Sequence, residues 1–358
     1  MIPCLLWVPV LLAVTGVSRV IDSSAEPMAP LRLNQVRFWA YQIQDLHEAR
    51  MVDALAESRY DLLVVEPTRT DKNSDETRQF DTAAMVRKLK ASTAHDGKHR
   101  KLVLAYISIG EAEEWRWYWT WPTWAKNKMR PPRLPEWIVA ADPDGWTGCF
   151  PVAFWDKEWK EIVLGRRRPP HDQGYNSIVD EVIRDGFDGV YLDWVEAFEE
   201  DNVKEAADKL KIDPAKEMVA LIGEIKELGR KTNPSFIVIQ QNGSALIDSP
   251  GILNVVDAIA QEDVWYRGDA DADWDQPNGY DRAQDKDFTD EVTGNLDKYK
   301  GAGKPVFTID YAVKHADLVY AKAKAKGYIA YCSRTSLSRL STTPPPGYTG
   351  DRSRPNPD

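Results

Sequence analysis

The sequence has few cysteines, few histidines and no excess of basic residues. Its 358 residues include three Cys and five His, and 56 Asp plus Glu against 46 Lys plus Arg give a formal net charge of −10. Three cysteines cannot build the disulfide scaffold of a small secreted domain, and five scattered histidines argue against a zinc site. A chain this acidic lacks the basic face that nucleic-acid binding requires, so we expect no nucleic-acid partner.

The sequence also lacks the Gly-rich fingerprint of dinucleotide-binding folds and the P-loop. We therefore expect no cofactor. An apolar run over residues 5–14 is too short to cross a bilayer but has the length of a signal-peptide core. Small residues up to Ala25 complete a cleavage pattern, so we predict a signal peptide over residues 1–25. Its removal would give a secreted or periplasmic protein with no membrane association. An uncleaved N-terminal anchor and a wrongly chosen start codon are the alternatives.

Aromatic residues, in contrast, are abundant in one place. The apolar fraction of 43% and the charged fraction of 28% are ordinary for a globular protein, but 14 residues are Trp. Nine of these fall within 45 residues: Trp115, Trp117, Trp119, Trp121, Trp124, Trp137, Trp146, Trp155 and Trp159. The clustering is the first functional indication. We expect about half of these rings to pack in the core or at its rim and two or three to face a ligand.

Eight short β-branched or aromatic runs alternate with segments of helical period. This alternation predicts an α/β protein with a parallel sheet, and eight units in about 300 residues fit a (β/α)8 TIM barrel. The expected strands are Val36–Ile43, Leu62–Glu66, Leu102–Ile109, Gly189–Trp194, Phe236–Gln241, Ala258–Asp263, Pro305–Tyr311 and Gly327–Ser333. The expected helices are Thr82–Ala91, Ser177–Asp185, Ala215–Lys231, Thr289–Lys300 and Ala316–Lys326.

We place the barrel domain at residues 26–340. The Trp-rich stretch forms an insertion after the third strand, Glu111–Arg168, with extra short strands expected at Trp137–Ala140 and Phe150–Phe154. Residues 341–358 are rich in Pro, Thr and Ser and predict a disordered tail.

Polar side chains gather where the predicted strands end. In a TIM barrel these ends and the loops that follow them build the active site. Five of the eight strands end in Asp or Glu, and such convergence of like charges costs stability, which favours a functional role. The substrate-binding candidates are Tyr41, Gln42, Glu66, Tyr106, Ser108, Glu111, Trp155, Trp194, Gln241, Asn242, Asp310 and Tyr311.

Two strand ends supply the catalytic candidates. The apolar run Gly189–Leu192 leads directly to Asp193, and Glu262 ends the sixth strand. These strands are next-but-one neighbours in a barrel, so their carboxylates can face each other, as glycosidic-bond hydrolysis requires. Trp faces would stack on sugar rings, and Tyr, Asn and Gln would bond the hydroxyls. Asp188 precedes its strand and is expected to have a structural role at the opposite end.

Six segments resemble glycoside hydrolase family 114, the endo-α-1,4-polygalactosaminidase-like barrels. They are FWAYQIQ (Phe38–Gln44), YISIGEAEEWRWYW (Tyr106–Trp119), FWDKEW (Phe154–Trp159), GFDGVYLDWVEAFE (Gly186–Glu199), AQEDVWY (Ala260–Tyr266) and TIDYA (Thr308–Ala312). They occur in the family's order along most of the chain, and the second and fourth are the specific ones.

The resemblance implies a (β/α)8 barrel that cleaves α-linked amino-sugar polysaccharides with retention, the substrate being a polymer such as cationic galactosamine. By position in the motifs, Asp193 would be the nucleophile and Glu262 the acid/base, with Asp263 a nearby competitor. The sequence departs from the family pattern in an acidic segment, Asp269–Asp287, and at Glu66, where Asp is common. Both departures leave the substrate open.

Other interpretations remain at this point. One is a non-catalytic polysaccharide-binding barrel used for adhesion or sensing. Another is a metal-dependent deacetylase, which is disfavoured because no histidine stands at a strand end. The acidic segment favours a solvated loop or substrate rim over a calcium site, because Trp274 and Tyr280 occupy positions where an EF-hand needs Gly and Glu. Export would also allow Cys149 and Cys332 to pair.

Overall fold

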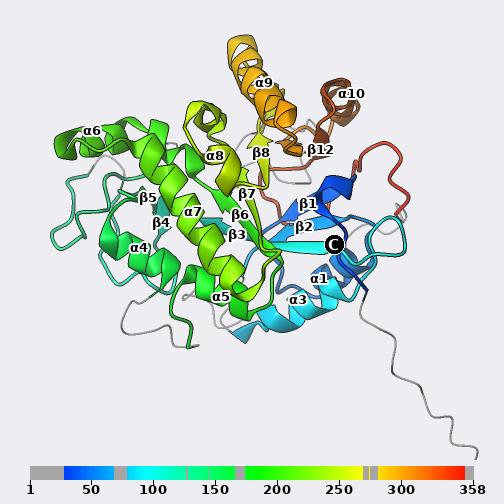
Figure 1. The fold of residues 1–358 in the computed structure, drawn as a ribbon, viewed down its shortest axis with the longest axis horizontal. Coiled ribbons are helices and arrows are strands. Elements are labelled where there is room, and N and C mark those ends of the chain that lie inside the picture. Colours follow the sequence, from blue (N-terminus) through cyan, green and yellow to red (C-terminus); the bar gives the residue numbers. More distant parts are fainter. Residues whose placement is uncertain are drawn as a thin grey trace, which may run out of the picture.

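Eight parallel strands form one sheet that curls into a barrel (Figure 1). The computed structural model describes residues 28–67, 79–125, 128–143, 145–165, 174–268, 274 and 281–350. Along the sheet the strands are β1 (Trp39–Gln42), β2 (Leu62–Val65), β3 (Leu102–Ser108), β6 (Gly189–Asp193), β7 (Ile237–Gln241), β8 (Ala258–Glu262), β11 (Val306–Asp310) and β12 (Ile329–Cys332). Each lies inside its predicted range, so the (β/α)8 prediction is confirmed.

The barrel closes where the last strand returns to the first. The indole nitrogen of Trp39 on β1 donates to the carbonyl of Ile329 on β12 (3.0 Å), and the ring of Trp39 packs on Tyr331. Strands such as β2 and β11 are buried along their whole length. This explains their nearly continuous apolar sequence, since a parallel strand is covered on one side by helices and on the other by the barrel interior.

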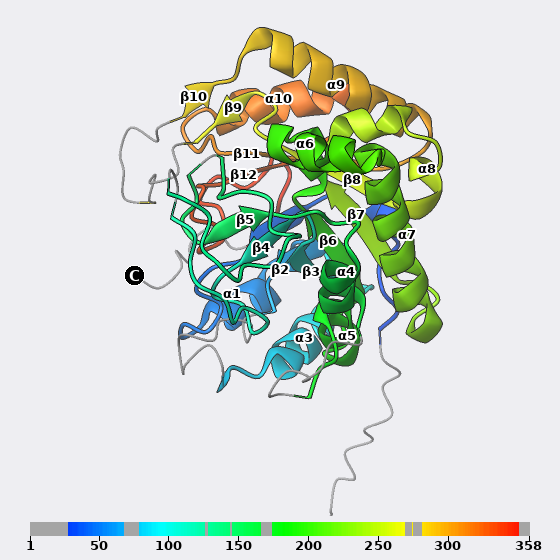
Figure 2. The same cartoon turned by 90° about the vertical axis from the view of Figure 1, so that its left-hand side faces the viewer.

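Helices surround the strands in both views (Figures 1 and 2). The described α-helices are α1 (Met51–Glu57), α3 (Thr82–Lys90), α4 (Lys157–Leu164), α5 (Ile178–Arg184), α6 (Asp201–Leu210), α7 (Pro214–Thr232), α8 (Ile252–Val255), α9 (Lys286–Gly301) and α10 (Ala316–Lys326). Helix starts follow the sequence signals: Asp81 accepts from the Ala84 amide, and Asp213 caps α7 with Pro214 in its first turn.

The Trp-rich insertion packs mainly as core. It adds an antiparallel pair, β4 (Glu111–Glu113) and β5 (Cys149–Pro151), whereas the strand expected at Trp137–Ala140 is reduced to one bridge between Ile138 and Val152. The rings of Trp119, Trp137 and Trp159 are buried. Trp119 stacks on Phe150 at 4.7 Å, whereas Trp146 is 52% exposed.

One question that the sequence left open and one expectation for the end of the chain can be compared with the structure. Cys149 and Cys332 are both buried free thiols, one in β5 and the other in β12, so they do not pair. Residues 341–350, expected to begin a disordered tail, pack on the barrel instead. Tyr348 stacks on Tyr60 at 4.5 Å, and Tyr320 donates to the Thr343 carbonyl. Aromatic contacts anchor a segment whose Pro-rich composition alone indicates disorder.

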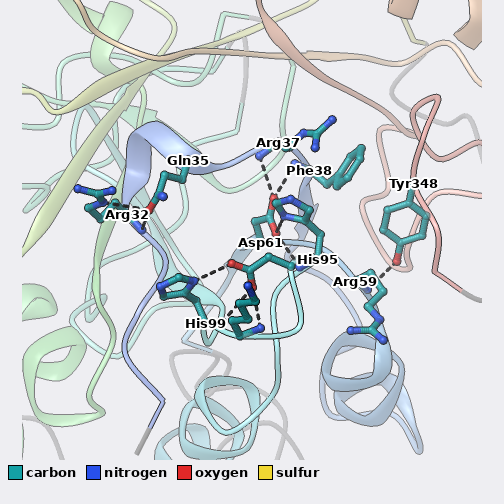
Figure 3. Close-up of polar contacts among 11 residues, drawn as sticks. Arg32, Gln35, Arg37, Phe38, Arg59, Asp61, His95, His99 and Tyr348 are labelled. Atoms are coloured by element: carbon teal, nitrogen blue, oxygen red, sulfur yellow. Dashed lines mark hydrogen bonds and ion pairs between the residues drawn. The ribbon is translucent and has the colours of Figure 1, made fainter.

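The same tail contributes to a polar network beside the start of β2 (Figure 3). Asp61, fully buried, accepts hydrogen bonds from the amides of Arg37 (2.8 Å), Phe38 (3.0 Å) and His95 (2.9 Å) and from the His95 ring (2.6 Å). Tyr348 accepts from the Arg59 amide at 2.8 Å. These bonds tie the segments at the N-terminal end of the barrel together.

Two sequence predictions fall largely outside the described residues: the signal peptide over residues 1–25 and most of the acidic segment at residues 269–287. Within the described ranges, no helix combines the length and the apolar character that crossing a bilayer requires.

Candidate active site

The two predicted catalytic carboxylates lie at the same end of the barrel. Asp193 ends β6 and Glu262 ends β8, with β7 between them. Register pairs Asp193 with Ser108 of β3 and Glu262 with Ile309 of β11. Both side chains are half-buried, and they are near enough that the Glu262 charge acts on Asp193.

Asp193 is held by one strong donor. The hydroxyl of Tyr106 on β3 donates to Asp193 Oδ2 at 2.5 Å, and the Trp194 backbone amide donates to the same carboxylate. Burial raises the pKa of Asp193, and the negative charge of Glu262 raises it further, while the two hydrogen bonds act in the opposite direction. A short charge-assisted bond of this kind fixes the orientation of the carboxylate.

Glu262 has a different set of partners. Tyr311 donates to its Oε1, Asn242 Nδ2 lies 3.5 Å from its Oε2, and Gln241 also donates to it. Burial raises the pKa of Glu262, and these neutral donors only partly offset that effect. Two carboxylates with raised pKa values in one site favour a state in which the pair shares a proton.

Two amide side chains at the end of β7 connect the site. Gln241 Oε1 accepts from the Tyr41 hydroxyl at 3.3 Å. Asn242 Oδ1 accepts from the Glu262 amide at 3.0 Å, and Asn242 Nδ2 donates to Glu196 Oε1 at 2.9 Å. Asn242 thus lies between two carboxylates and fixes the spacing of the strand ends.

Glu196 is a site residue that the sequence predictions missed. It lies in the 3-10 helix η3 (Val195–Glu199), three residues after Asp193. Its Oε2 atom is buried without a hydrogen-bond partner among the described residues. Burial first and the Asp193 charge second raise the pKa of Glu196. The sequence signal that could have found it is a Glu three residues after Asp193, in the segment that directly follows the end of β6, where active-site residues of a barrel lie.

Three successive strands end in an unusual backbone conformation. Trp194, Asn242 and Asp263, the residues that follow β6, β7 and β8, have φ values of 57°, 58° and 54°. This left-handed region is uncommon for residues with a Cβ, and such strain clusters at functional sites. Gly110 is required nearby, because an added Cβ would lie 2.0 Å from the Trp194 carbonyl oxygen.

Three predicted substrate-binding residues are buried and bond backbone groups. Gln42 is buried and donates to the Ser338 carbonyl at 2.9 Å, and Ser108 is buried and bonds the Glu111 carbonyl at 3.2 Å. Asp310 is fully buried and accepts from the amides of Trp265 (2.6 Å) and Tyr266 (2.7 Å). Each satisfies backbone groups of a neighbouring loop, a requirement that position at a strand end does not reveal.

Two predicted acidic contacts also have other partners. Glu66 forms an ion pair with the buried Arg116, which also pairs with Glu113. Glu111 is 4% exposed, and burial together with the charges of Asp142 and Glu113 raises its pKa to about 11. This shift favours the protonated form of Glu111 at neutral pH. Neither side chain offers a free negative charge to a ligand.

The two tryptophans predicted to contact substrate differ in position. Trp194 directly follows Asp193 and is half-buried beside it. Trp155 is half-buried in the insertion, where its ring packs edge-on against Phe154 at 5.0 Å. The strand-end set that the structure brings together is therefore Asp193, Glu262, Tyr41, Tyr106, Gln241, Asn242 and Tyr311, joined by Glu196.

Three of the described histidines pair with carboxylates outside this set. His95 and His99, both shown in Figure 3, pair with Asp61 and Asp96, and His315 pairs with Asp281 at 3.0 Å. No group of three or more His, Cys, Asp and Glu side chains that could hold a metal ion occurs among the residues with described positions.

Comparison with known proteins places this arrangement in a family. Residues 24–346 match the model of glycoside-hydrolase family GH114. The chain belongs to family GH114. The match spans nearly all of the described barrel, including both carboxylate-bearing strand ends, so the resemblance seen in the sequence segments is confirmed.

Relatives cover most of the chain. The protein MJ1477 of Methanocaldococcus jannaschii is 33% identical over 328 residues, covering 86% of this chain and 80% of its own length. A protein of Deinococcus radiodurans is 31% identical over 312 residues, covering 86% of this chain and 83% of its own.

Solved structures share the fold at lower identity. The glycoside hydrolase domain of PelA from Pseudomonas aeruginosa has a TM-score of 0.56 at 18% identity, covering 85% of this chain and 97% of that domain. Ega3 of Aspergillus fumigatus, solved in complex with galactosamine, has a TM-score of 0.53 at 14% identity, covering 87% of this chain and 98% of its own. Family and fold together identify a glycosidase of the GH114 type.

Proposed function

We propose that this GH114 protein cleaves α-linked amino-sugar polysaccharides, as an endo-α-1,4-polygalactosaminidase-like enzyme, with Asp193 as nucleophile and Glu262 as acid/base. The observation that carries the proposal is that these two carboxylates lie at the same end of the barrel, on strands separated by β7, and that each is bonded by its own neutral donors. Tyr106 and the Trp194 amide bond Asp193, while Tyr311, Gln241 and Asn242 bond Glu262.

In the proposed mechanism one proton is shared by the pair at the start. Tyr106 stabilises the ionised form of Asp193, which attacks the anomeric carbon as the glycosidic bond breaks. Protonated Glu262 gives its proton to the leaving oxygen. Glu262, now ionised, takes a proton from water, and that water releases the sugar from Asp193, so the proton returns to Glu262. Retention of the anomeric configuration follows from two successive displacements.

The proposed substrate carries amines, and carboxylates near the pair support this. Glu196 has an unpartnered buried Oε2 and lies within electrostatic reach of Asp193 and Glu262. A protonated sugar amine beside Glu196 would lower the carboxylate pKa values that burial raises. The galactosamine bound to Ega3 is the same chemistry in a protein of this fold. We assign this role to Glu196 and not to Glu66, which pairs with Arg116. Glu111 and Asp310 are also less suited to it, because they are more deeply buried than Glu196.

The first experiment incubates the protein with α-1,4-galactosamine polymer, its N-acetylated form and a β-linked glucosamine polymer, and follows products by mass. We expect release of oligomers from the first polymer only. Glu196→Gln, compared with the exposed Glu227→Gln on α7, should raise KM for the cationic polymer with a smaller change in kcat. Binding without any cleavage, unchanged in Asp193→Asn, would instead support a binding barrel.

The second experiment assigns the two roles. NMR of the first product should show the α anomer, and the β anomer would contradict retention. With an activated substrate, azide should rescue Asp193→Ala to give the β-azide, because azide then makes a single displacement. It should rescue Glu262→Ala to give the α-azide, because Asp193 makes the first displacement and azide makes the second. The opposite pattern would exchange the two assignments.

We also propose that residues 1–25 direct export to a secreted or periplasmic location. Expression in a bacterial host followed by N-terminal sequencing of the exported protein tests this. A first residue near Glu26 is expected, and retention of Met1 in the cytosol would contradict it.

A further inference from the structure

A cavity of about 790 Å³ opens at the N-terminal end of the barrel, opposite the carboxylate pair. Its walls come from residues that directly precede strands, including Asp188 before β6, Phe236 before β7 and Pro305 before β11. Residues 30–34, ahead of β1, form another wall. Catalytic residues of this fold lie at the other end, so the cavity is separate from the proposed active site.

The cavity is basic although the protein is acidic. Its polar lining includes five cations (Arg32, Lys90, Arg100, Arg230 and Lys304) and two carboxylates (Asp188 and Asp257), an excess of three positive charges. The chain as a whole has a net charge of −10. A local charge of opposite sign inside a concave wall concentrates anions there.

Two of the five cations have no carboxylate to neutralise them. Asp188 is bonded by Arg100 at 2.7 and 2.8 Å and by Lys90 at 2.9 Å, and Asp257 by Arg230 at 3.2 Å and by Lys226 at 2.9 Å. For Arg32 and Lys304, no ion pair is found within the described part of the chain. Arg32 bonds Gln35, and Lys304 donates to the Val256 carbonyl at 2.8 Å.

The pKa of Lys304 reflects this excess of positive charge. Burial lowers its pKa, and the positive charges of Lys226 and Arg230 lower it further, against the effect of Asp257. An anion bound beside Lys304 and Arg230 would reverse that effect and stabilise the charged amine.

We infer that this cavity is a binding site for an anionic ligand that carries a phosphate or carboxylate group on an apolar body. The anionic group would lie against Arg230 and Lys304, and the apolar body against Leu33, Ile183 and Ile237, which line the cavity and are only partly buried. The volume falls within the range of small-molecule sites and exceeds what one inorganic anion fills. The inference is independent of the proposed hydrolase activity.

Calorimetric titration of the full chain with 1-naphthyl phosphate, 1-naphthoate, naphthalene-1-methanol and inorganic phosphate tests the site. We expect the two aromatic anions to bind at least tenfold more tightly than inorganic phosphate and the neutral alcohol not to bind measurably. The tighter of the two aromatic anions identifies the headgroup as phosphate or carboxylate.

The variant Arg230→Gln/Lys304→Met should weaken aromatic-anion binding at least tenfold. Its matched control, Lys209→Met/Lys324→Met, removes two exposed cations from α6 and α10 and should leave the affinity unchanged. Asp257 keeps Lys226 as a partner in the test variant, and circular dichroism checks its fold. Polysaccharide cleavage should be equal in both variants, which separates failure here from failure of the proposed function.

Equal loss of affinity in the test and control variants would show a general charge effect and overturn the site. Absence of binding by either aromatic anion would overturn it as well. Loss of polysaccharide cleavage in the folded test variant would show that the cavity is not independent of the active site.

Discussion

Both ends of the barrel contain carboxylates, but the groups that bond them differ between the two ends. At the N-terminal end, Asp188 and Asp257 each bond two cations. At the C-terminal end, Asp193, Glu262 and Glu196 are bonded by hydroxyl and amide groups of Tyr106, Tyr311, Gln241 and Asn242. A carboxylate bonded to cations stabilises the fold, whereas one bonded only to neutral donors in a buried place keeps a raised pKa.

The difference shows that the carboxylates at the C-terminal end lower the stability of the fold but suit acid/base catalysis. Arg116 is the exception at the C-terminal end, where it neutralises Glu66 and Glu113. Among the described residues, no cation pairs with the Asp193 or Glu262 carboxylate, so each makes ionisation of the other less favourable. Acid/base catalysis on a glycosidic bond uses a proton held by one of two carboxylates. A cation paired with that carboxylate would lower its pKa and favour loss of the proton.

The largest expected effect is on activity at Asp193. Asp193→Asn should lower kcat by at least about 10³-fold, because it removes the proposed nucleophile and keeps the shape of the side chain. Stability should stay equal or rise, since the change removes one of two repelling buried carboxylates. Rates on the galactosamine polymer and thermal unfolding measure both. Retained activity would contradict the assignment of Asp193 as nucleophile. A large loss of stability would show that Asp193 stabilises the fold, as Asp188 does.

The matching change at the other end is Asp188→Asn. It should destabilise the fold by about 3 kcal/mol, since it leaves Arg100 and Lys90 without their shared partner. Activity per folded molecule should be unchanged. Urea unfolding measures the free energy, with kcat corrected for the folded fraction. A fall in kcat at full folding would show that the two ends are coupled.

A third change tests the neutral donor on Glu262. Tyr311→Phe removes a hydrogen bond that lowers the pKa of Glu262, so that pKa should rise. Since the reaction needs Glu262 protonated, the alkaline limb of the pH–rate profile should move to higher pH, with kcat about tenfold lower. Tyr320→Phe is the control, because its hydroxyl bonds the Thr343 carbonyl away from the pair. An unmoved alkaline limb would contradict the role of Glu262.

The smallest effect, counted per pH unit, concerns the pH dependence of stability. Folding raises the pKa of Glu111 to about 11, so between about pH 5 and 9 the unfolded chain releases a proton that the folded chain keeps. Stability therefore falls with rising pH, by about 1 kcal/mol per pH unit from this group. Glu111→Gln should flatten that slope in urea unfolding at several pH values, whereas Glu227→Gln on an exposed face should not. An unchanged slope would show that Glu111 ionises when folded.

Much of this fold can be predicted from local patterns in the sequence. All eight barrel strands, the capped starts of α3 and α7 and both proposed catalytic carboxylates follow from alternating apolar runs and from the polar residues at their ends. The hydrogen-bond partners of the residues at the strand ends cannot be predicted in this way. Gln42 and Asp310 have the residue types of a sugar-binding site, yet each bonds backbone groups that other parts of the chain bring to it.

The sequence by itself determined the order and direction of the strands, because the spacing of apolar and polar residues is a property of neighbours along the chain. Only the tertiary structure decided which carboxylates have a cation. Arg100 comes 88 residues before Asp188, and Tyr311 comes 49 residues after Glu262. Contacts at such separations depend on how the barrel closes, and they give Asp188 a structural role and leave Asp193 with a raised pKa.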